Sequence, residues 1–224
     1  MSKKTTLLLV LGLCFTNLSI GAEPPPTTTL DHEALFSLND LKETEDQLNI
    51  YKVEHEHLRL QTELALIKLQ IDRRLYQKAV ISEFDLKESE KNYDLKSNEF
   101  ALAQGKIKER LIYVEIKKQI ANKKLGKKSS VKETAQLYAD DWKAKLELGT
   151  LWIKGAQIEL DFATFQYNQV KKLNFNNSAS YEELLEVTEV KNEKEISLVI
   201  LQERLKALQK NYDEAQKLAD DLKP

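Results

Sequence analysis

Proline is missing from this chain between Pro26 and Pro224, and this absence limits the fold more than any other feature of the sequence. Proline is the strongest breaker of helices, and glycine, the next strongest, is also scarce there. The same stretch lacks the alternating β-branched runs that strands need. These observations predict an all-α protein with long helices. The glycines of the stretch are Gly105, Gly126, Gly149 and Gly155.

Apolar residues recur in the stretch at alternating spacings of three and four, the pattern of a left-handed coiled coil. Such a seam extends from Tyr138 to Val170, and another from Leu198 to Leu222. Nearer the N-terminus the pattern is less regular, because His55 and Thr62 fall near seam positions. There we expect the packed seam to consist of Leu60, Leu64, Ile67, Ile71 and Leu75. A further seam repeats every seven residues, at Leu86, Tyr93, Phe100, Ile107 and Val114.

Four helix starts are indicated by a serine that is followed three residues later by an acid. In this capping arrangement the hydroxyl accepts a backbone N–H bond while the acid interacts with the positive end of the helix dipole. The serines are Ser37, Ser82, Ser130 and Ser180. Helix ends are indicated by the basic residues at 73–78, 123–128 and 171–172. Each helix then has about 40 residues and a length of about 60 Å.

The turn positions predict how the helices are connected. Short reversals at residues 79–81 and 174–179 and a basic linker at 123–129 make the four helices alternate up, down, up, down. The fold class is therefore long antiparallel coiled-coil hairpins in tandem, with hairpin 1 at 37–122 and hairpin 2 at 130–224. Because the helices have similar lengths, we expect one bundle with both reversals at the same end. Whether the two hairpins pack on each other or splay is left open.

The N-terminus has the composition of an export signal. Residues 1–22 combine Lys3 and Lys4 with an apolar run and small residues before Glu23, which is typical of a secretory signal peptide. Residues 23–36 are expected to form an extended leader. The mature chain would then be periplasmic and would have no transmembrane segment. Association with the outer membrane and lipidation at Cys14, which follows Leu13, are left open.

One sequence motif occurs twice, 98 positions apart, once at each reversal. Each copy has a basic pair, a leucine, and seven residues after that leucine a serine that opens a helix. The basic pair and the serine are also explained by ordinary helix capping and dipole effects. These effects do not explain the repeated leucines, so we interpret the two reversals as docking tips. The candidate docking residues are Leu75, Ser82, Leu86, Leu173, Ser180 and Leu184.

Sites for chemistry are not expected. His55 and His57 are two residues apart, so on a helix they point in different directions and do not converge on a metal. The sequence has no pairing of nucleophile and base and no glycine-rich phosphate loop, so no catalytic, cofactor or metal site is predicted. A net charge of −2 with both signs interspersed does not fit a nucleic-acid binder. The aromatic residues Tyr138, Trp142, Trp152 and Tyr167 either fill the space between helices or, if they line a cavity, bind a ligand.

Residues 75–86 resemble the hairpin tip of HlyD-type periplasmic adaptors, also called membrane fusion proteins. Those tips carry a leucine and a serine seven residues apart, as do Leu75 with Ser82 and Leu173 with Ser180. The doubled hairpin is also similar to TolC-like outer-membrane efflux channels, whose protomers carry two helical hairpins as tandem repeats. The resemblance covers helical regions only, since the β-domains of adaptors and the β-strands of channels have no counterpart in this sequence.

The resemblance implies a non-enzymatic protein that docks through its paired tips to a helical-hairpin component of an efflux or secretion apparatus, or that associates with itself. An alternative function is that of a periplasmic holdase or scaffold that uses the faces of the hairpins. A more remote alternative is a small-ligand binder that uses the aromatic residues.

Overall fold

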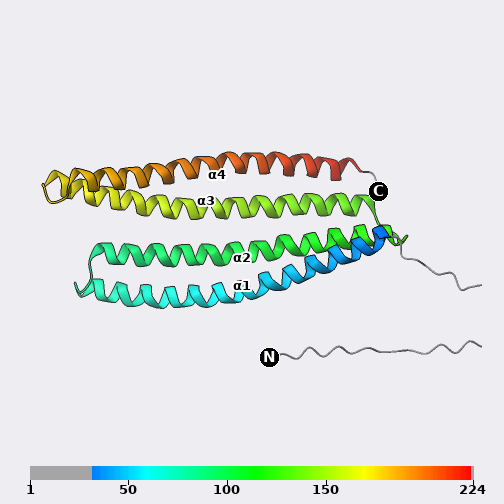
Figure 1. Ribbon diagram of the computed structural model, residues 1–224, viewed down its shortest axis with the longest axis horizontal. Helices are drawn as coiled ribbons and strands as arrows, with labels where there is room; N and C mark the ends of the chain where they lie inside the picture. Colours follow the sequence, from blue (N-terminus) through cyan, green and yellow to red (C-terminus); the bar gives the residue numbers. More distant parts are fainter. Residues whose placement is uncertain (1–31, 223–224) are drawn as a thin grey trace, which may run out of the picture. The chain divides into compact units, whose positions relative to one another are not determined.

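The computed structural model describes residues 32–222, which form four long helices. These are α1 (His32–Gln77), α2 (Glu83–Lys124), α3 (Val131–Phe175) and α4 (Tyr181–Asp221) (Figure 1). No strand occurs in residues 32–222. The all-α class and the four antiparallel helices are therefore confirmed. The signal peptide expected at 1–22 and residues 23–31 of the expected leader lie outside the described residues.

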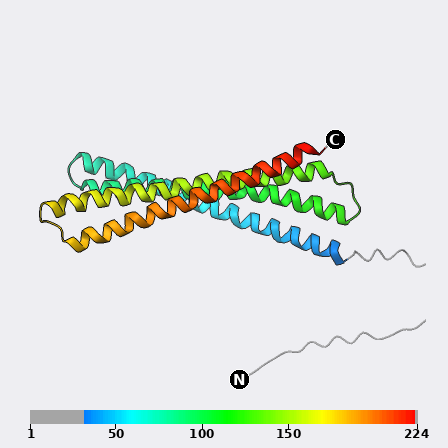
Figure 2. The same cartoon turned by 90° about the horizontal axis from the view of Figure 1, so that it is seen from above.

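The helices form an open row, in which the two hairpins pack on each other through α2 and α3 and do not splay. Among residues 32–222, α1 contacts only α2, α2 contacts α3, and α3 contacts α4. Viewed from above, α1 and α4 incline in opposite directions, so the row is twisted (Figure 2). One face of α1 and one face of α4 consequently have no helix partner within the described residues.

The two hairpins are held together by close packing of α2 against α3. Asn98 of α2 is buried, and its Nδ2 donates a hydrogen bond of 3.0 Å to the Leu151 carbonyl of α3. Gly155 makes this approach possible, because a Cβ atom at that position would lie 2.8 Å from Asn98 Nδ2. The Asn98 Oδ1 atom has no hydrogen-bond partner. The bond therefore contributes more to the register of the two helices than to net stability.

Other contacts extend the α2–α3 interface along both helices. Leu148 packs over Gly105, where an added Cβ atom would lie 2.7 Å from Leu148 Cδ2. At the start of α2, the Phe84 ring lies 5.9 Å from Phe162 and 6.2 Å from Phe165, centroid to centroid. These contacts extend from Phe84 at the start of α2 to Gly105 near its middle, and they fix how the hairpins align.

The face of α1 that packs against α2 is different from the one expected. It consists of Thr44, Leu48, Tyr51, His55, Leu58, Thr62, Ala65, Leu69 and Asp72, and we call it the inner face of α1. Its polar members have partners: Thr62 Oγ1 donates to the carbonyl of Lys96 at 3.0 Å, and Asp72 accepts a hydrogen bond from Ser89. The predicted seam was wrong in its main part, because Leu60, Leu64, Ile67 and Ile71 are exposed while Leu75 is half-buried.

Two predicted helix boundaries also differ in the structure. Helix α1 begins at His32, so the last residues of the leader expected at 23–36 are helical. Ser37 does not cap this helix, because it lies inside α1 and its hydroxyl donates to the Glu33 carbonyl at 2.8 Å. The connection between the hairpins covers residues 125–130, since α2 continues to Lys124.

Carboxylates within the α2–α3 interface oppose its packing at neutral pH. Asp141 is buried and lies 2.7 Å from Lys145 Nζ through its Oδ2 atom, while its Oδ1 atom has no partner. Burial raises the pKa of Glu109; the Lys145 cation opposes the rise and the Asp141 charge adds to it. Ionisation of Glu109 therefore destabilises the folded chain.

We expect Glu109→Gln to stabilise the protein at pH 7. Where the folded-state pKa of a carboxyl is raised, the folded chain binds more protons than the unfolded chain, so stability falls as pH rises through that window. The substitution should remove this fall, which urea unfolding at pH 4 and pH 7 would measure. Glu115→Gln, at an exposed position on the same helix, is the control. Equal unfolding midpoints for wild type and Glu109→Gln at pH 7 would contradict the expectation.

Candidate functional site

The two hairpin tips have the same backbone structure. We call residues 78–82 the first tip and residues 176–180 the second tip. In the first, the Val80 N–H donates to the Leu75 carbonyl at 2.9 Å; in the second, the Ser178 N–H donates to the Leu173 carbonyl at 2.8 Å. This bond closes a Schellman motif, in which the residue after the helix adopts a left-handed conformation. That residue is Ala79 with φ 55° in one tip and Asn177 with φ 54° in the other.

The helix that follows each tip starts in the predicted way. Ser82 and Ser180 are the N-caps, and in both cases the serine and the acid three residues later form a reciprocal capping box. The Ser82 hydroxyl and backbone N–H both bond to Asp85, and these bonds hold the pKa of Asp85 below its ordinary value. The repeated sequence motif thus corresponds to a repeated backbone geometry, a Schellman motif followed by a capping box.

The exposed apolar side chains at the tips are largely not those expected from the sequence. Leu173 is exposed, but Leu75, Leu86 and Leu184 are half-buried. Ser82 and Ser180 are exposed. Six other large apolar residues near the tips, none of them among the candidate docking residues, are also exposed. They are Tyr76, Val80 and Phe84 near the first tip and Phe175, Tyr181 and Leu185 near the second.

Phe175 is the most prominent of these residues, with 88% of its surface exposed. It lies beside an open hollow of about 510 Å³ that is also lined by Asn168, Lys171, Lys172 and Asn176. The end of α3 directly before the second tip therefore combines an exposed aromatic ring with two cations. A signal for Phe175 and Tyr181 was present in the sequence: both residues are directly next to a reversal, where no neighbouring helix is available to cover a side chain.

The tips lie at the same end of the helix row, but they are not level (Figure 1). Phe84, next to the first tip, contacts Phe165 of α3. Helix α3 then continues for ten residues to Phe175 before it ends. At 1.5 Å per residue, α3 thus extends about 15 Å past the residue that Phe84 contacts.

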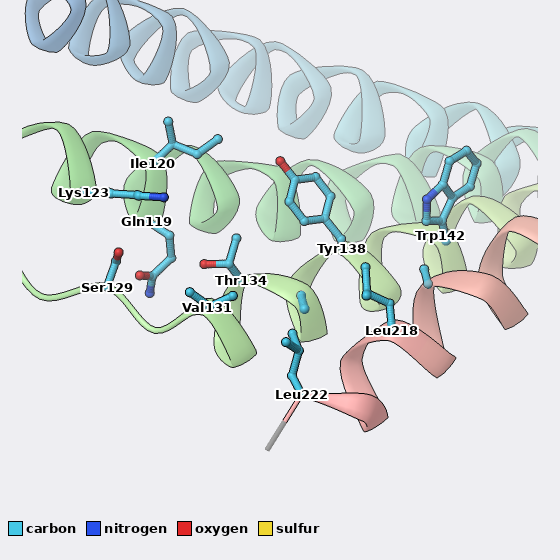
Figure 3. Close-up of a pocket in the computed structure, with 12 residues that line it drawn as sticks. Gln119, Ile120, Lys123, Ser129, Val131, Thr134, Tyr138, Trp142, Leu218 and Leu222 are labelled. Atoms are coloured by element: carbon cyan, nitrogen blue, oxygen red, sulfur yellow. The ribbon is translucent and has the colours of Figure 1, made fainter. Parts of the chain in front are cut away.

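The aromatic residues of α3 divide into two groups. Tyr138 and Trp142 line an apolar cavity of about 530 Å³ at the end of the row that carries the 125–130 connection (Figure 3). Its other walls come from the C-terminal parts of α2 and α4, including Ile120 and Leu218. Trp152 is exposed, and Tyr167 lies under Lys171 and Lys191. A ligand-binding role was expected only for aromatic residues that line a cavity. Tyr138 and Trp142 line this one.

The two histidines diverge as their spacing predicted. His55 lies on the inner face of α1 and stacks on Phe100 at 4.6 Å between centroids, whereas His57 is exposed and bonds to Gln61. In the part of the chain that the structure describes, no three metal-ligating side chains come together. None of the four helices in that part is both long and apolar enough to span a bilayer.

Comparisons with protein-family models, with curated proteins and with solved structures found no match to this chain. The functional interpretation therefore depends on the geometry of the tips.

We expect Ala79→Gly to stabilise the protein by about 1 kcal/mol. A left-handed conformation costs an alanine roughly that much and costs glycine almost nothing. The converse change at the third reversal, Gly126→Ala at φ 69°, should destabilise by a similar amount. Asn177→Gly should have a smaller effect, since asparagine tolerates this conformation. Urea unfolding measures all three, and a destabilised Ala79→Gly variant would exclude the Schellman geometry at the first tip.

The shared end of the tips can be tested by distance measurement. Spin labels at Val80→Cys and Ser178→Cys, in a Cys14→Ser background that removes the only cysteine, should lie well below the roughly 60 Å length of one helix. Labels at Val80→Cys and Lys128→Cys should lie at about that length and provide the long reference. If the two pairs give the same distance, the tips are not at one end.

Proposed function

We propose that this protein is a non-enzymatic periplasmic docking protein that engages a helical-hairpin component of an efflux or secretion apparatus through its paired tips. The observation that carries the proposal is the repetition of one tip geometry, 98 residues apart, at one end of the helix row. Two equal turns are useful to a chain that contacts a partner with repeated or symmetrical features. The periplasmic location follows from the export signal expected at residues 1–22.

The chemistry of the tips suggests what the partner presents. Val80 at the first tip and Phe175 and Tyr181 at the second offer apolar groups of the kind that fill pockets at protein interfaces. Lys171 and Lys172 add positive charge beside Phe175. A complementary surface would have apolar holes between helices and acidic residues around them, which is what the groove of a coiled-coil hairpin can provide.

Site-specific photo-crosslinking in the source organism tests the proposal. A photoreactive phenylalanine analogue at Phe175 or Tyr181 should capture a discrete partner, and mass spectrometry should identify a helical-hairpin protein of the cell envelope. The same analogue at Leu218, an exposed position at the opposite end of the row, is the control. Capture from Leu218 equal to capture from both tip positions would contradict docking through the tips.

Charge substitution separates docking from the holdase or scaffold alternative. Phe175→Asp with Val80→Asp should reduce partner capture at least about tenfold, because exposed apolar anchors are the residues whose loss weakens interfaces most. Helicity by circular dichroism should stay unchanged, since neither side chain is buried. Ile196→Asp with Leu218→Asp places the same charges on exposed apolar positions away from the tips. A holdase that uses the hairpin faces would show the opposite response.

A further inference from the structure

An apolar stripe, interrupted by His57, covers the face of α1 that no other helix of residues 32–222 contacts. It consists of Ile50, Val53, Leu60, Leu64, Ile67 and Ile71, and we call it the outer stripe. These side chains are 51–71% exposed. Helix α1 lies at the edge of the row, and among the described helices only α2 contacts it (Figure 1). Six adjacent aliphatic residues are thus presented to the surroundings on one helix.

The outer stripe has the spacing of a second coiled-coil seam. With His57 included, its positions are separated by three, four, three, four, three and four residues. If these are the a and d positions of a heptad, the inner face of α1 falls at b and f, on the opposite side of the helix. Helix α1 is therefore built to pack against a helix on each side, and residues 32–222 supply only one of these helices.

The outer stripe matches an antiparallel copy of itself. When Leu60 of one copy faces Leu64 of the other, Val53 faces Ile71 and His57 faces Ile67. A two-fold axis between the copies makes every one of these contacts occur twice. Four aliphatic residues of the stripe then meet one another, Ile67 meets His57, and Ile50 at the end of the seam faces Arg74 of the other copy.

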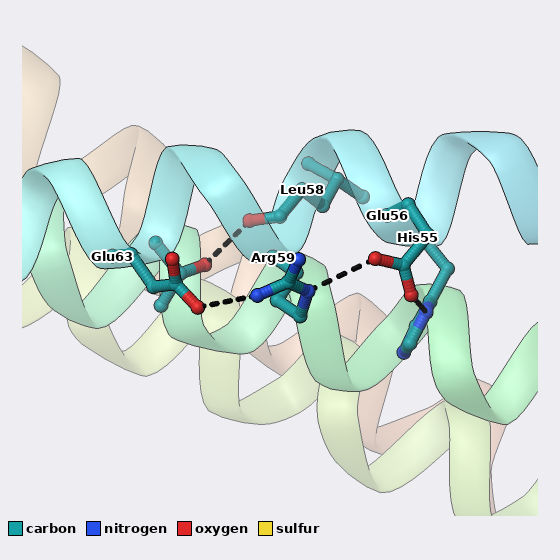
Figure 4. Close-up of polar contacts among 6 residues, drawn as sticks. His55, Glu56, Leu58, Arg59 and Glu63 are labelled. Carbon is teal, nitrogen blue, oxygen red and sulfur yellow. Dashed lines mark hydrogen bonds and ion pairs between the residues drawn. The ribbon is translucent and has the colours of Figure 1, made fainter.

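The charges beside the outer stripe favour this arrangement. In the same register, Glu54 of each copy lies beside Lys68 of the other, at positions where coiled coils form ion pairs between helices. Both side chains are exposed, and within residues 32–222 neither forms an ion pair. On the other rim, Glu56 and Glu63 are already paired with Arg59 at 2.9 and 2.6 Å (Figure 4). Their repulsion between copies is thereby reduced.

The area of the outer stripe is sufficient for a dimer. At roughly 100 Å² for each half-exposed aliphatic side chain, six residues would bury on the order of 600 Å² per copy, or about 1,200 Å² in total, which is the lower end of the range for stable interfaces. The outer face of α4 does not carry a comparable apolar stripe. Its exposed apolar residues lack the three–four alternation, as the gaps from Leu185 to Val190 and from Val190 to Ile196 illustrate.

We propose that two copies of this chain associate antiparallel through the outer stripes of their α1 helices. The dimer places the two α2 helices on the outside of the α1 pair, brings the first tip of each copy level with residues 42–46 of the other copy's α1, and leaves the second tip, on the other hairpin, outside the contact. The proposed dimer does not rest on the proposed docking function, because no residue of either tip belongs to the outer stripe.

Sedimentation analysis of the full chain, from about 1 to about 100 µM, tests the proposal in the affinity range expected for an interface of this size. The wild type should dimerise, and Leu60→Glu with Leu64→Glu should raise the dissociation constant at least about tenfold. Ile196→Glu with Ile200→Glu is the matched control, with the same spacing and similar exposure on α4. Both variants retain residues 1–31, so any association through that segment affects both equally.

A charge exchange tests the orientation. Glu54→Lys should weaken the dimer several-fold, and Glu54→Lys with Lys68→Glu should restore it. A wild type that stays monomeric, or a dimer that the α4 substitutions disrupt and the α1 substitutions do not, would overturn the proposal. Weakening by Glu54→Lys that the double exchange fails to reverse would overturn the antiparallel arrangement. Circular dichroism confirms that all variants fold, as expected for substitutions of exposed residues.

Discussion

The packing of α2 against α3 is the contact on which the rest of the structure depends, because it turns two separate hairpins into one unit with paired tips. Each hairpin needs only its own turn and its own seam to form. The alignment of the hairpins is set by Asn98, which reaches the Leu151 carbonyl across a surface that Gly155 leaves bare. A buried amide with one unsatisfied oxygen is poor for stability. It selects one register, however, as single polar residues do in coiled-coil seams.

Local features of the fold were predictable from the sequence because their causes lie within a few residues. Ser82 and Ser180 cap helices since each has an acid at the third position, and both capping boxes are present. Ser37 satisfied the same pattern and failed, because the helix starts before it and its hydroxyl bonds to the preceding turn. The left-handed Ala79 was not predicted, since alanine gives no sign of that conformation. Only comparison with Asn177 reveals it.

Features set by distant contacts were predicted less well. Helix α1 carries two seams, and the more apolar one was assigned to the interior. The less apolar one packs there because α2 offers partners for its polar groups, such as the Lys96 carbonyl for Thr62 and Ser89 for Asp72. The same limit explains the open row of helices. The candidate docking leucines were placed on the correct turns, but Leu75 and Leu184 are half-buried, and Phe175, at 88%, has the highest exposed fraction of the large apolar residues near the tips.

The unequal reach of the tips has a geometric consequence for whatever receives them. A flat surface would meet Phe175 before it met the first tip, because α3 continues for ten residues, a rise of about 15 Å, past the residue that Phe84 contacts. Simultaneous contact requires a receptor with two levels, such as the shoulder where one helix of a coiled coil ends and its neighbour continues. Shortening α3 and α4 by seven residues each would preserve every heptad position and lower the upper level by about 10 Å. The length of the second hairpin therefore sets the difference in height between the two contact sites that a receptor must offer.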